Sequence, residues 1–166
     1  MKIRNEEASD AEAIGLLTSE AFMNAAHSDG NEAQVVADLR RAGALTISLV
    51  ATNEASGLIG HIAFSPVQID QVSGGWFALG PVSIRPASQR AGIGRALILE
   101  GLHRLKILGA DGCVLLGDPA YYQRFGFAVG KELTYYRRPN PYLQWKVLNG
   151  TLARGDVTFH SAFNPK

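Results

Sequence analysis

The sequence has almost no cysteine. Among its 166 residues the single cysteine is Cys113, so the chain cannot form an internal disulfide. Cys113 lies in the apolar run 112–116, a context that favours a buried thiol over a reactive one. Chains without disulfides are typical of reducing compartments, and we expect a cytoplasmic protein.

An excess of charge of one sign is also missing. Sixteen Lys and Arg residues face 15 Asp and Glu residues, so no overall field attracts nucleic acid, and we expect no nucleic-acid partner. No apolar run approaches the ~18 residues of a membrane span, and residues 1–7 are not followed by the apolar core of a signal peptide. We therefore expect no membrane partner. Four scattered histidines show no metal-ligand spacing, so no metal is expected.

What is present is enough apolar sequence for one core. At 166 residues and 46% hydrophobic content, the chain is expected to form a single domain over residues 1–166. Ser9 and Glu12 have capping-box spacing and predict a helix at 10–23, and Asn31 is placed to cap a second helix. Strands are expected at 45–52, 58–64, 76–84, 113–116, 127–129, 133–136 and 156–160. This order predicts a mixed α/β sheet, with parallel pairing across the helix that follows residue 94.

The strand at 76–84 contains Pro81, which has no N–H to donate to a ladder. Its position predicts a bulge or a splayed edge. The strand leads into the loop Gln89–Gly94 and then into a helix, where free backbone amides and a positive helix terminus suit a phosphate. Gly92 and Gly94 allow a close approach of the backbone, and Arg90 and Arg95 add charge.

Two common phosphate sites do not fit this loop. A mononucleotide P-loop needs Lys-Ser or Lys-Thr where Arg95-Ala96 stands. A dinucleotide site needs an early βαβ unit, whereas this loop follows several strands that look antiparallel. The spacing alone leaves open an anion site of another class, or a glycine-rich helix start with no ligand.

The residues around this loop resemble the GNAT family of N-acetyltransferases. Residues 82–97 look like the strand, loop and helix of that family, with Gln89, Gly92 and Gly94 matching its glycine signature. A second family element, a Tyr four residues before Gly-Phe, is matched by Tyr122. The run 60–66 also resembles a subgroup of predicted acetyltransferases.

The resemblance implies a GNAT fold, in which a central six- to seven-stranded mixed sheet has helices on both faces and is splayed at the acyl-CoA site. It implies acetyl-CoA as cosubstrate, with the pantetheine arm between two diverging strands. The cofactor-binding residues that it implies are Val82, Ser83, Ile84, Gln89, Arg90, Ala91, Gly92, Ile93, Gly94 and Arg95. Asp118 departs from the family pattern, because a common Asn that contacts the cofactor stands there in many relatives.

For the chemistry, the family match implies that Tyr122 is the general acid that protonates the CoA thiolate; packing beside Phe125 and Phe127 is the alternative. A backbone N–H near Val82 is the natural oxyanion donor. Glu32 and His61 are candidate bases, set against a helix-dipole role for the first and a core position for the second. His27 is expected to be solvated.

The sequence therefore predicts direct acetyl transfer to a primary amine of a small molecule, an amino acid or a protein. A non-catalytic CoA-binding module and an aminoacyl-tRNA acceptor remain open alternatives, although the near-neutral charge disfavours the second. The segment 137–142 is a candidate for the acceptor site or for the 3′-phosphate of the cofactor. A homodimer stays open.

Overall fold

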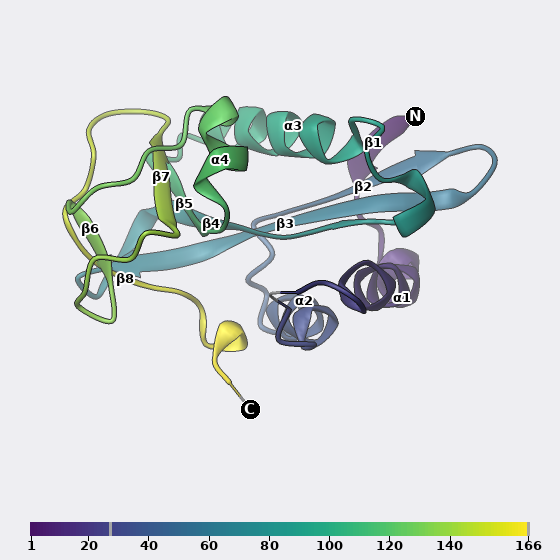
Figure 1. Ribbon diagram of the computed structural model, residues 1–166, viewed down its shortest axis with the longest axis horizontal. Helices are drawn as coiled ribbons and strands as arrows, with labels where there is room; N and C mark the ends of the chain where they lie inside the picture. Colours follow the sequence, from purple (N-terminus) through teal and green to yellow (C-terminus); the bar gives the residue numbers. More distant parts are fainter. Residues whose placement is uncertain (27, 166) are drawn as a thin grey trace.

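The computed structural model describes residues 1–26 and 28–165, which form a mixed sheet with helices on both faces (Figure 1). The strands are β1 (Lys2–Asn5), β2 (Ile47–Asn53), β3 (Gly57–Ile69), β4 (Val72–Ile84), β5 (Gly112–Leu116), β6 (Leu133–Tyr135), β7 (Leu143–Val147) and β8 (Gly155–Thr158). Their order is β1-β2-β3-β4-β5-β7, with β8 paired to both β3 and β6. The pairs β4–β5 and β6–β8 are parallel and the others antiparallel.

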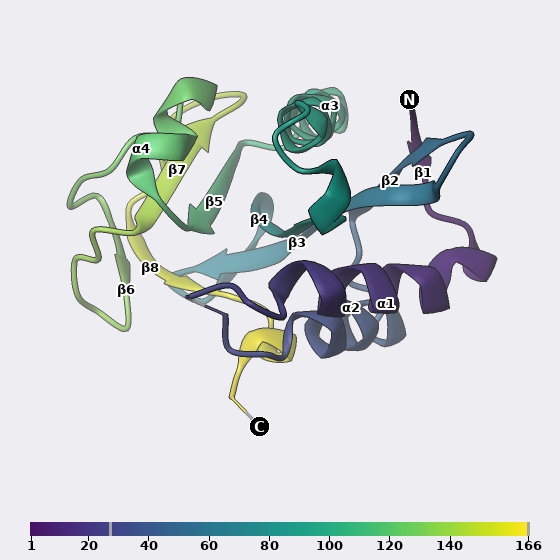
Figure 2. The ribbon, with the colours of Figure 1, turned by 45° about the vertical axis from the view of Figure 1, so that its right-hand side comes forward.

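Two layers of helix enclose this sheet. The helices are α1 (Ala11–Phe22), α2 (Glu32–Arg41), α3 (Ile93–Ile107) and the short α4 (Pro119–Tyr122). Figures 1 and 2 show α1 and α2 on one face, with α3 and α4 on the other. Strand β2 shows why: Leu49 and Ala51 join the core under α3, whereas Val50 packs with α1 and α2. The predicted mixed α/β class and two-faced helix cover are confirmed.

No helix in the described ranges is long and apolar enough to cross a membrane.

The sheet has eight strands in the described residues, where six or seven were expected. Strand β7 comes from residues 143–147, a segment for which no strand was predicted, and it pairs antiparallel with β5. The strand predicted at 127–129 is wrong: that segment contributes only an isolated bridge between Ala128 and Trp145. The parallel pairing predicted for β4 and β5 across α3 is confirmed.

The first helix begins differently from the prediction. A 3-10 turn at Ala8–Asp10 precedes α1, and the backbone N–H of Glu7 donates to Asp10 Oδ2 at 2.7 Å. Arg4 of β1 also donates to Asp10 Oδ2, at 2.7 Å. Glu7 and Asp10 form the capping box at this start, and Asp10 is the N-cap of α1, so the predicted Ser9–Glu12 capping box is wrong. Asn31 does occupy the N-cap of α2, but its side chain makes no capping hydrogen bond.

Candidate functional site

Strands β4 and β5 separate partway along their length. Their parallel pairing joins Trp76–Ala78 to Gly112–Val114, and both strands then continue without pairing to each other. Figure 2 shows the two ribbons diverging beside α3. A cleft between parallel strands whose backbone groups lack a partner can accept an extended ligand through main-chain hydrogen bonds.

A β-bulge marks the point of separation. In the pairing of β4 with β3, Leu79 lies opposite Phe64 and Val82 lies opposite Ile62. Two residues of β4, Gly80 and Pro81, therefore stand against one residue of β3. The bulge predicted at Pro81 is confirmed, and the Gly80–Pro81 peptide bond is cis.

The free edge of β4 presents the amides of Val82 and Ile84. Arg85 N–H donates to Ile59 O of β3 at 2.9 Å. Because successive N–H groups of a strand point to opposite edges, the amides of Val82 and Ile84 face away from β3, toward the gap. The Ile84 carbonyl lies on the same free edge and accepts a hydrogen bond from Gln89 Nε2 at 3.2 Å.

Ser83 does not reach this gap. By the same alternation its backbone groups face β3, and its side chain is buried, with Oγ donating to Thr18 Oγ1 at 3.4 Å. Ser83 thus ties β4 to α1. This geometry does not favour the predicted role of Ser83 in cofactor binding, and the roles predicted for Val82 and Ile84 stay predictions with which the geometry is compatible.

The glycine loop forms an N-terminal cradle at α3. Gly92 is the N-cap with φ of 83°, and Arg90 also has a positive φ of 64°. Ala96 N–H donates to Gly92 O at 3.1 Å, so the amides that precede it, through Ile93, Gly94 and Arg95, are not used by the first turn. These N–H groups lie at the positive end of a 15-residue helix, which suits an anion.

The side chains of this loop include one buried apolar residue and two exposed arginines. Ile93 is buried in the core under α3 and fixes the loop to the sheet. Arg90, Ala91 and Arg95 are exposed. The loop from Gln89 to Arg95 therefore presents its free amides between two exposed guanidinium groups, those of Arg90 and Arg95.

Helix α4 presents two neighbouring tyrosines beside the diverging strands. Its N-cap is Asp118, whose Oδ1 accepts from Ala120 N at 2.9 Å. The ring of Tyr122 packs edge-on against Tyr121 at 4.9 Å and Phe127 at 6.0 Å. Burial, the largest cause, raises the pKa of Tyr122 to about 12, so its hydroxyl is protonated at neutral pH.

Tyr121 points to a different place. A Cβ added at Gly94 would lie 3.6 Å from the Tyr121 hydroxyl, and the Arg124 guanidinium stacks 4.7 Å from the centre of the Tyr121 ring. Tyr121 therefore belongs with the loop at α3, whereas the Tyr122 ring packs against Gly117, directly after β5. Asp118 is engaged as the cap of α4, and this explains an acidic residue at that position.

Lys146 holds the turn that carries these tyrosines. Its Nζ donates to Phe125 O at 2.6 Å, next to Gly126, whose φ is 88°. Lys146 comes from β7, so it connects that strand to the end of the Tyr122 turn. Lys146 was not predicted from the sequence, and no local motif signals it, because the two partners are 21 residues apart.

A groove opens next to the bulge. This cavity of about 280 Å³ is lined by backbone and side chains of 78–81, by Leu116 at the end of β5, by Glu32 and Asp29, and by aromatic rings. The Glu32 carboxylate accepts hydrogen bonds from Ser28 Oγ at 2.6 Å and Asp29 N at 3.2 Å. Glu32, one of the two candidate bases, lines the groove. A neighbouring cavity of about 620 Å³ is also lined by Leu116.

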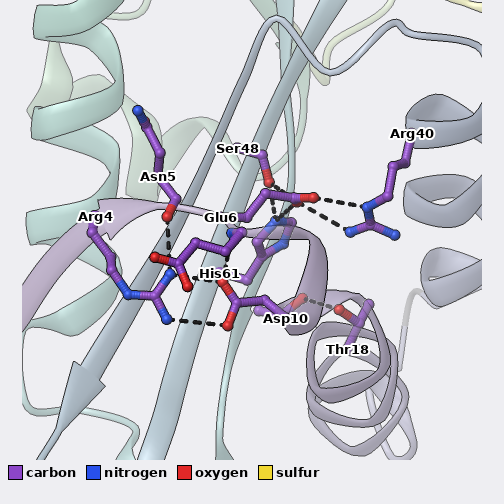
Figure 3. A network of polar contacts seen from close by, with 10 residues as sticks. Arg4, Asn5, Glu6, Asp10, Thr18, Arg40, Ser48 and His61 are labelled. Carbon is purple, nitrogen blue, oxygen red and sulfur yellow. Dashed lines mark hydrogen bonds and ion pairs between the residues drawn. The ribbon is translucent and has the colours of Figure 1, made fainter.

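His61 does not line that groove and lies in a polar network between the sheet and the first two helices (Figure 3). Its side chain is fully buried, and its Nε2 is 2.8 Å from Ser48 Oγ. The Ser48 hydroxyl donates to Glu6, whose carboxylate pairs with Arg40 of α2 through Nε at 2.8 Å. Of the two roles that the sequence left open for His61, this burial favours the core position over the proton shuttle.

The network also fixes the state of His61. Because Ser48 donates its proton to Glu6, Nε2 of His61 carries the hydrogen and donates to Ser48 Oγ. His61 Nδ1 is buried with no partner among the described residues, so protonation would bury an N–H with no acceptor. Burial, the largest cause, lowers the pKa of His61 to about 4 despite the nearby Glu6. The imidazole is neutral at pH 7.

Two other predictions concern residues outside this site. His27 lies outside the described residues. In the segment 137–142, Arg137 and Arg138 are exposed in the turn after β6 and line neither cavity, and Arg137 N–H donates to Asp156 Oδ1 at 2.7 Å. Asn140 and Tyr142 of the same segment line the neighbouring cavity of about 620 Å³. Among residues 1–26 and 28–165, no group of three or more His, Cys, Asp or Glu side chains is arranged to hold a metal ion.

A sheet that splays at a bulge, with a free strand edge leading into a glycine-rich helix start, is the arrangement of an acetyltransferase. The family model described as the Acetyltransferase (GNAT) family matches residues 12–127, and the chain belongs to this family. It is accordingly an acyltransferase of the N-acetyltransferase type.

Particular relatives agree over the full length. The chain is 40% identical over 172 aligned residues to the uncharacterized N-acetyltransferase YhbS of Escherichia coli, covering 99% of both chains. A crystal structure of YhbS in complex with CoA matches with a TM-score of 0.88 at 34% identity, covering 99% of this chain and 92% of that one. A GNAT acetyltransferase from Brucella melitensis in complex with acetyl-CoA matches with a TM-score of 0.86 at 46% identity, covering 98% and 97%.

Proposed function

We propose that the protein transfers an acetyl group from acetyl-CoA directly to a primary amine in a ternary complex, without a covalent enzyme intermediate. The observation that carries the proposal is the free edge of β4, where Val82 and Ile84 present amides to the gap and lead into the cradle at α3. The Ile84 N–H suits a carbonyl of the pantetheine arm, the Val82 N–H suits the thioester carbonyl, and the cradle at α3 suits the pyrophosphate. The acetyl-CoA and CoA complexes of the two similar structures support this assignment.

The roles of the residues follow from their places. Val82 N–H, released by the bulge, donates to the oxyanion that forms when the amine nitrogen attacks the thioester carbon. As the C–S bond breaks, Tyr122 gives its proton to the sulfur. Glu32, in the groove, takes the proton that the amine loses, directly or through a water.

The acceptor is a small molecule, an amino acid or a protein amino group. We also propose that residues 1–166 act as one domain and that the protein works in the cytoplasm. A chain that binds CoA as a sensor or scaffold without turnover is the alternative from another class, and the test below separates the two.

The test compares two adjacent phenols. In a thiol-release assay with acetyl-CoA and a panel of amines, Tyr122→Phe is expected to lower kcat by about 10²-fold or more, while the calorimetric Kd for CoA is kept. Tyr121→Phe is the matched variant: its hydroxyl lies at the α3 loop, so its effect is expected on CoA affinity and kcat is expected to stay close to wild type.

Two results would contradict the proposal. Binding of CoA with no thiol release on any amine would support the sensor or scaffold. A kcat that is insensitive to Tyr122→Phe in an active enzyme would remove Tyr122 as the general acid and leave transfer itself intact.

A further inference from the structure

We infer that the acceptor is a primary amine on an aromatic or similarly broad apolar body, with no carboxylate or phosphate group near the amine. This inference rests on the proposed function, since it names the acceptor of the same site. It concerns the groove of about 280 Å³ beside the bulge, defined here as the acceptor groove.

The charge of the acceptor groove has one sign. Asp29 and Glu32 line it from the start of α2 and the segment before it, and no Lys, Arg or described His is among its lining residues. Two carboxylates attract an ammonium group as it enters and repel a carboxylate or phosphate held close to the amine. An α-amino acid would bring its own carboxylate into this field with no cation to pair it.

One wall of the acceptor groove is aromatic. Tyr135, Phe159 and Phe163 form a chain of rings, with centroids 5.4 Å apart for the first pair and 5.9 Å for the second. All three are only partly buried, and Phe22 adds a fourth ring from the end of α1. Such a wall packs against a flat apolar body and also favours a cation held over a ring face.

The position of the bulge orients the acceptor. Gly80 and Pro81 line the acceptor groove and adjoin Val82, whose amide faces the gap where the acyl group is transferred. The reacting nitrogen must therefore lie at the bulge, near Glu32, and the rest of the molecule extends along the rings. At about 280 Å³ the acceptor groove is at the small end of ligand sites, which suits a body of one ring or two.

The experiment uses three compounds that share one ring and one amine. Phenethylamine has no group on the carbon next to the amine, L-phenylalaninamide has a neutral one, and L-phenylalanine has a carboxylate of similar size. Thiol release from acetyl-CoA is measured with each, and kcat/KM is expressed per concentration of neutral amine. Ethanolamine serves as the amine without an apolar body.

Phenethylamine and L-phenylalaninamide are expected to be acetylated, with kcat/KM for L-phenylalanine lower than for the amide by about tenfold or more. Asp29→Asn is expected to reduce the ratio of kcat/KM for L-phenylalaninamide to kcat/KM for L-phenylalanine. Glu12→Gln is the matched control, because it removes a carboxylate at the other end of α1, ~15 Å along the helix from the groove, and should leave the ratio unchanged.

Failure of the inference and failure of the proposed function give different results. Equal kcat/KM for L-phenylalanine and its amide, or for ethanolamine and phenethylamine, overturns the inference while transfer stands. If CoA binds and no amine is acetylated, the proposed function fails. Calorimetry of the same compounds with the CoA-saturated protein then decides the inference: preferential binding of phenethylamine over L-phenylalanine supports it, and no preference overturns it.

Discussion

Acidification should unfold this protein partly through one buried imidazole. The folded state keeps His61 neutral, with a pKa of about 4, whereas an unfolded histidine takes up its proton near pH 6.5. Between these values the unfolded chain binds more protons, so the stability contributed by His61 is complete above pH ~6.5 and is lost as the pH falls toward 4. Glu6, Arg40, Asp10 and Ser48 surround the ring.

The size of this effect follows from the two pKa values. At pH 5 the unfolded imidazole is almost fully protonated and the folded one mostly neutral, which lowers the free energy of unfolding by about 2 kcal/mol relative to pH 7. Glu6 and Asp10 have pKa values lowered below 4.5 and 3.8, and their paired forms stabilise the fold at higher pH. The stabilisation by these two carboxylates is lost mainly below pH 5. A comparison of the free energy of unfolding at pH 7 and pH 5 therefore reports mainly on His61.

Urea unfolding at the two pH values measures the prediction. Wild type is expected to lose about 2 kcal/mol between pH 7 and pH 5, and His61→Gln is expected to lose much less, whatever its stability at pH 7. His103→Gln is the matched control, since His103 is exposed on α3, and it should lose as much as wild type. An undiminished loss in His61→Gln would refute the assignment of this pH dependence to the buried ring.

Two glycine predictions can be tested in the same protein. A Cβ at Gly101 would lie 2.3 Å from Cε2 of the buried Phe64, so Gly101→Ala should lower the free energy of unfolding in urea by about 1–3 kcal/mol. A Cβ at Gly15 has no atom within 4 Å, so Gly15→Ala should raise the same free energy by about 0.5–1 kcal/mol. Equal effects of the two substitutions would contradict the packing of Gly101 against Phe64. Gly92→Ala forces a side chain onto a φ of 83°, which costs about 1 kcal/mol, so its calorimetric Kd for CoA should rise about fivefold; an unchanged Kd would show that the loop does not need this conformation to bind.

The parts of the site that are local in sequence were predictable from it. Pro81 cannot donate to a ladder, and the bulge appears at that residue. The loop up to Gly94 is contiguous, so its spacing alone places the amides at a helix start. The missed strand β7 also had a signal, the alternation in 143–147, but the charged, proline-rich residues before it suggested a loop.

The parts that depend on distant contacts were not predictable. Ser83 and Val82 are neighbours, and the sequence predicts cofactor binding for both. Only the register with β3 shows which of the two has backbone groups that face the gap. His61 lies in an apolar strand that is compatible with a site or with the core. Its state is set by Ser48 and Glu6, which come from two other segments. Such assignments need the paired strands in place, because burial and partner choice are tertiary properties.

The buried network and the acceptor groove are connected through α2. Near the C-terminal end of this helix, Arg40 pairs with Glu6. At its N-terminal end, Glu32 is the first residue of the helix and lines the acceptor groove. A helix of 10 residues is ~15 Å long and stiff, so fixing one end against Glu6, which directly follows β1, also limits where the other end lies relative to the bulge. Ser48 donates to Glu6 and accepts from the neutral His61, so both residues hold Glu6 in position for that pair. Although His61 does not line the acceptor groove, it therefore supports, through Ser48 and Glu6, the helix that begins at Glu32.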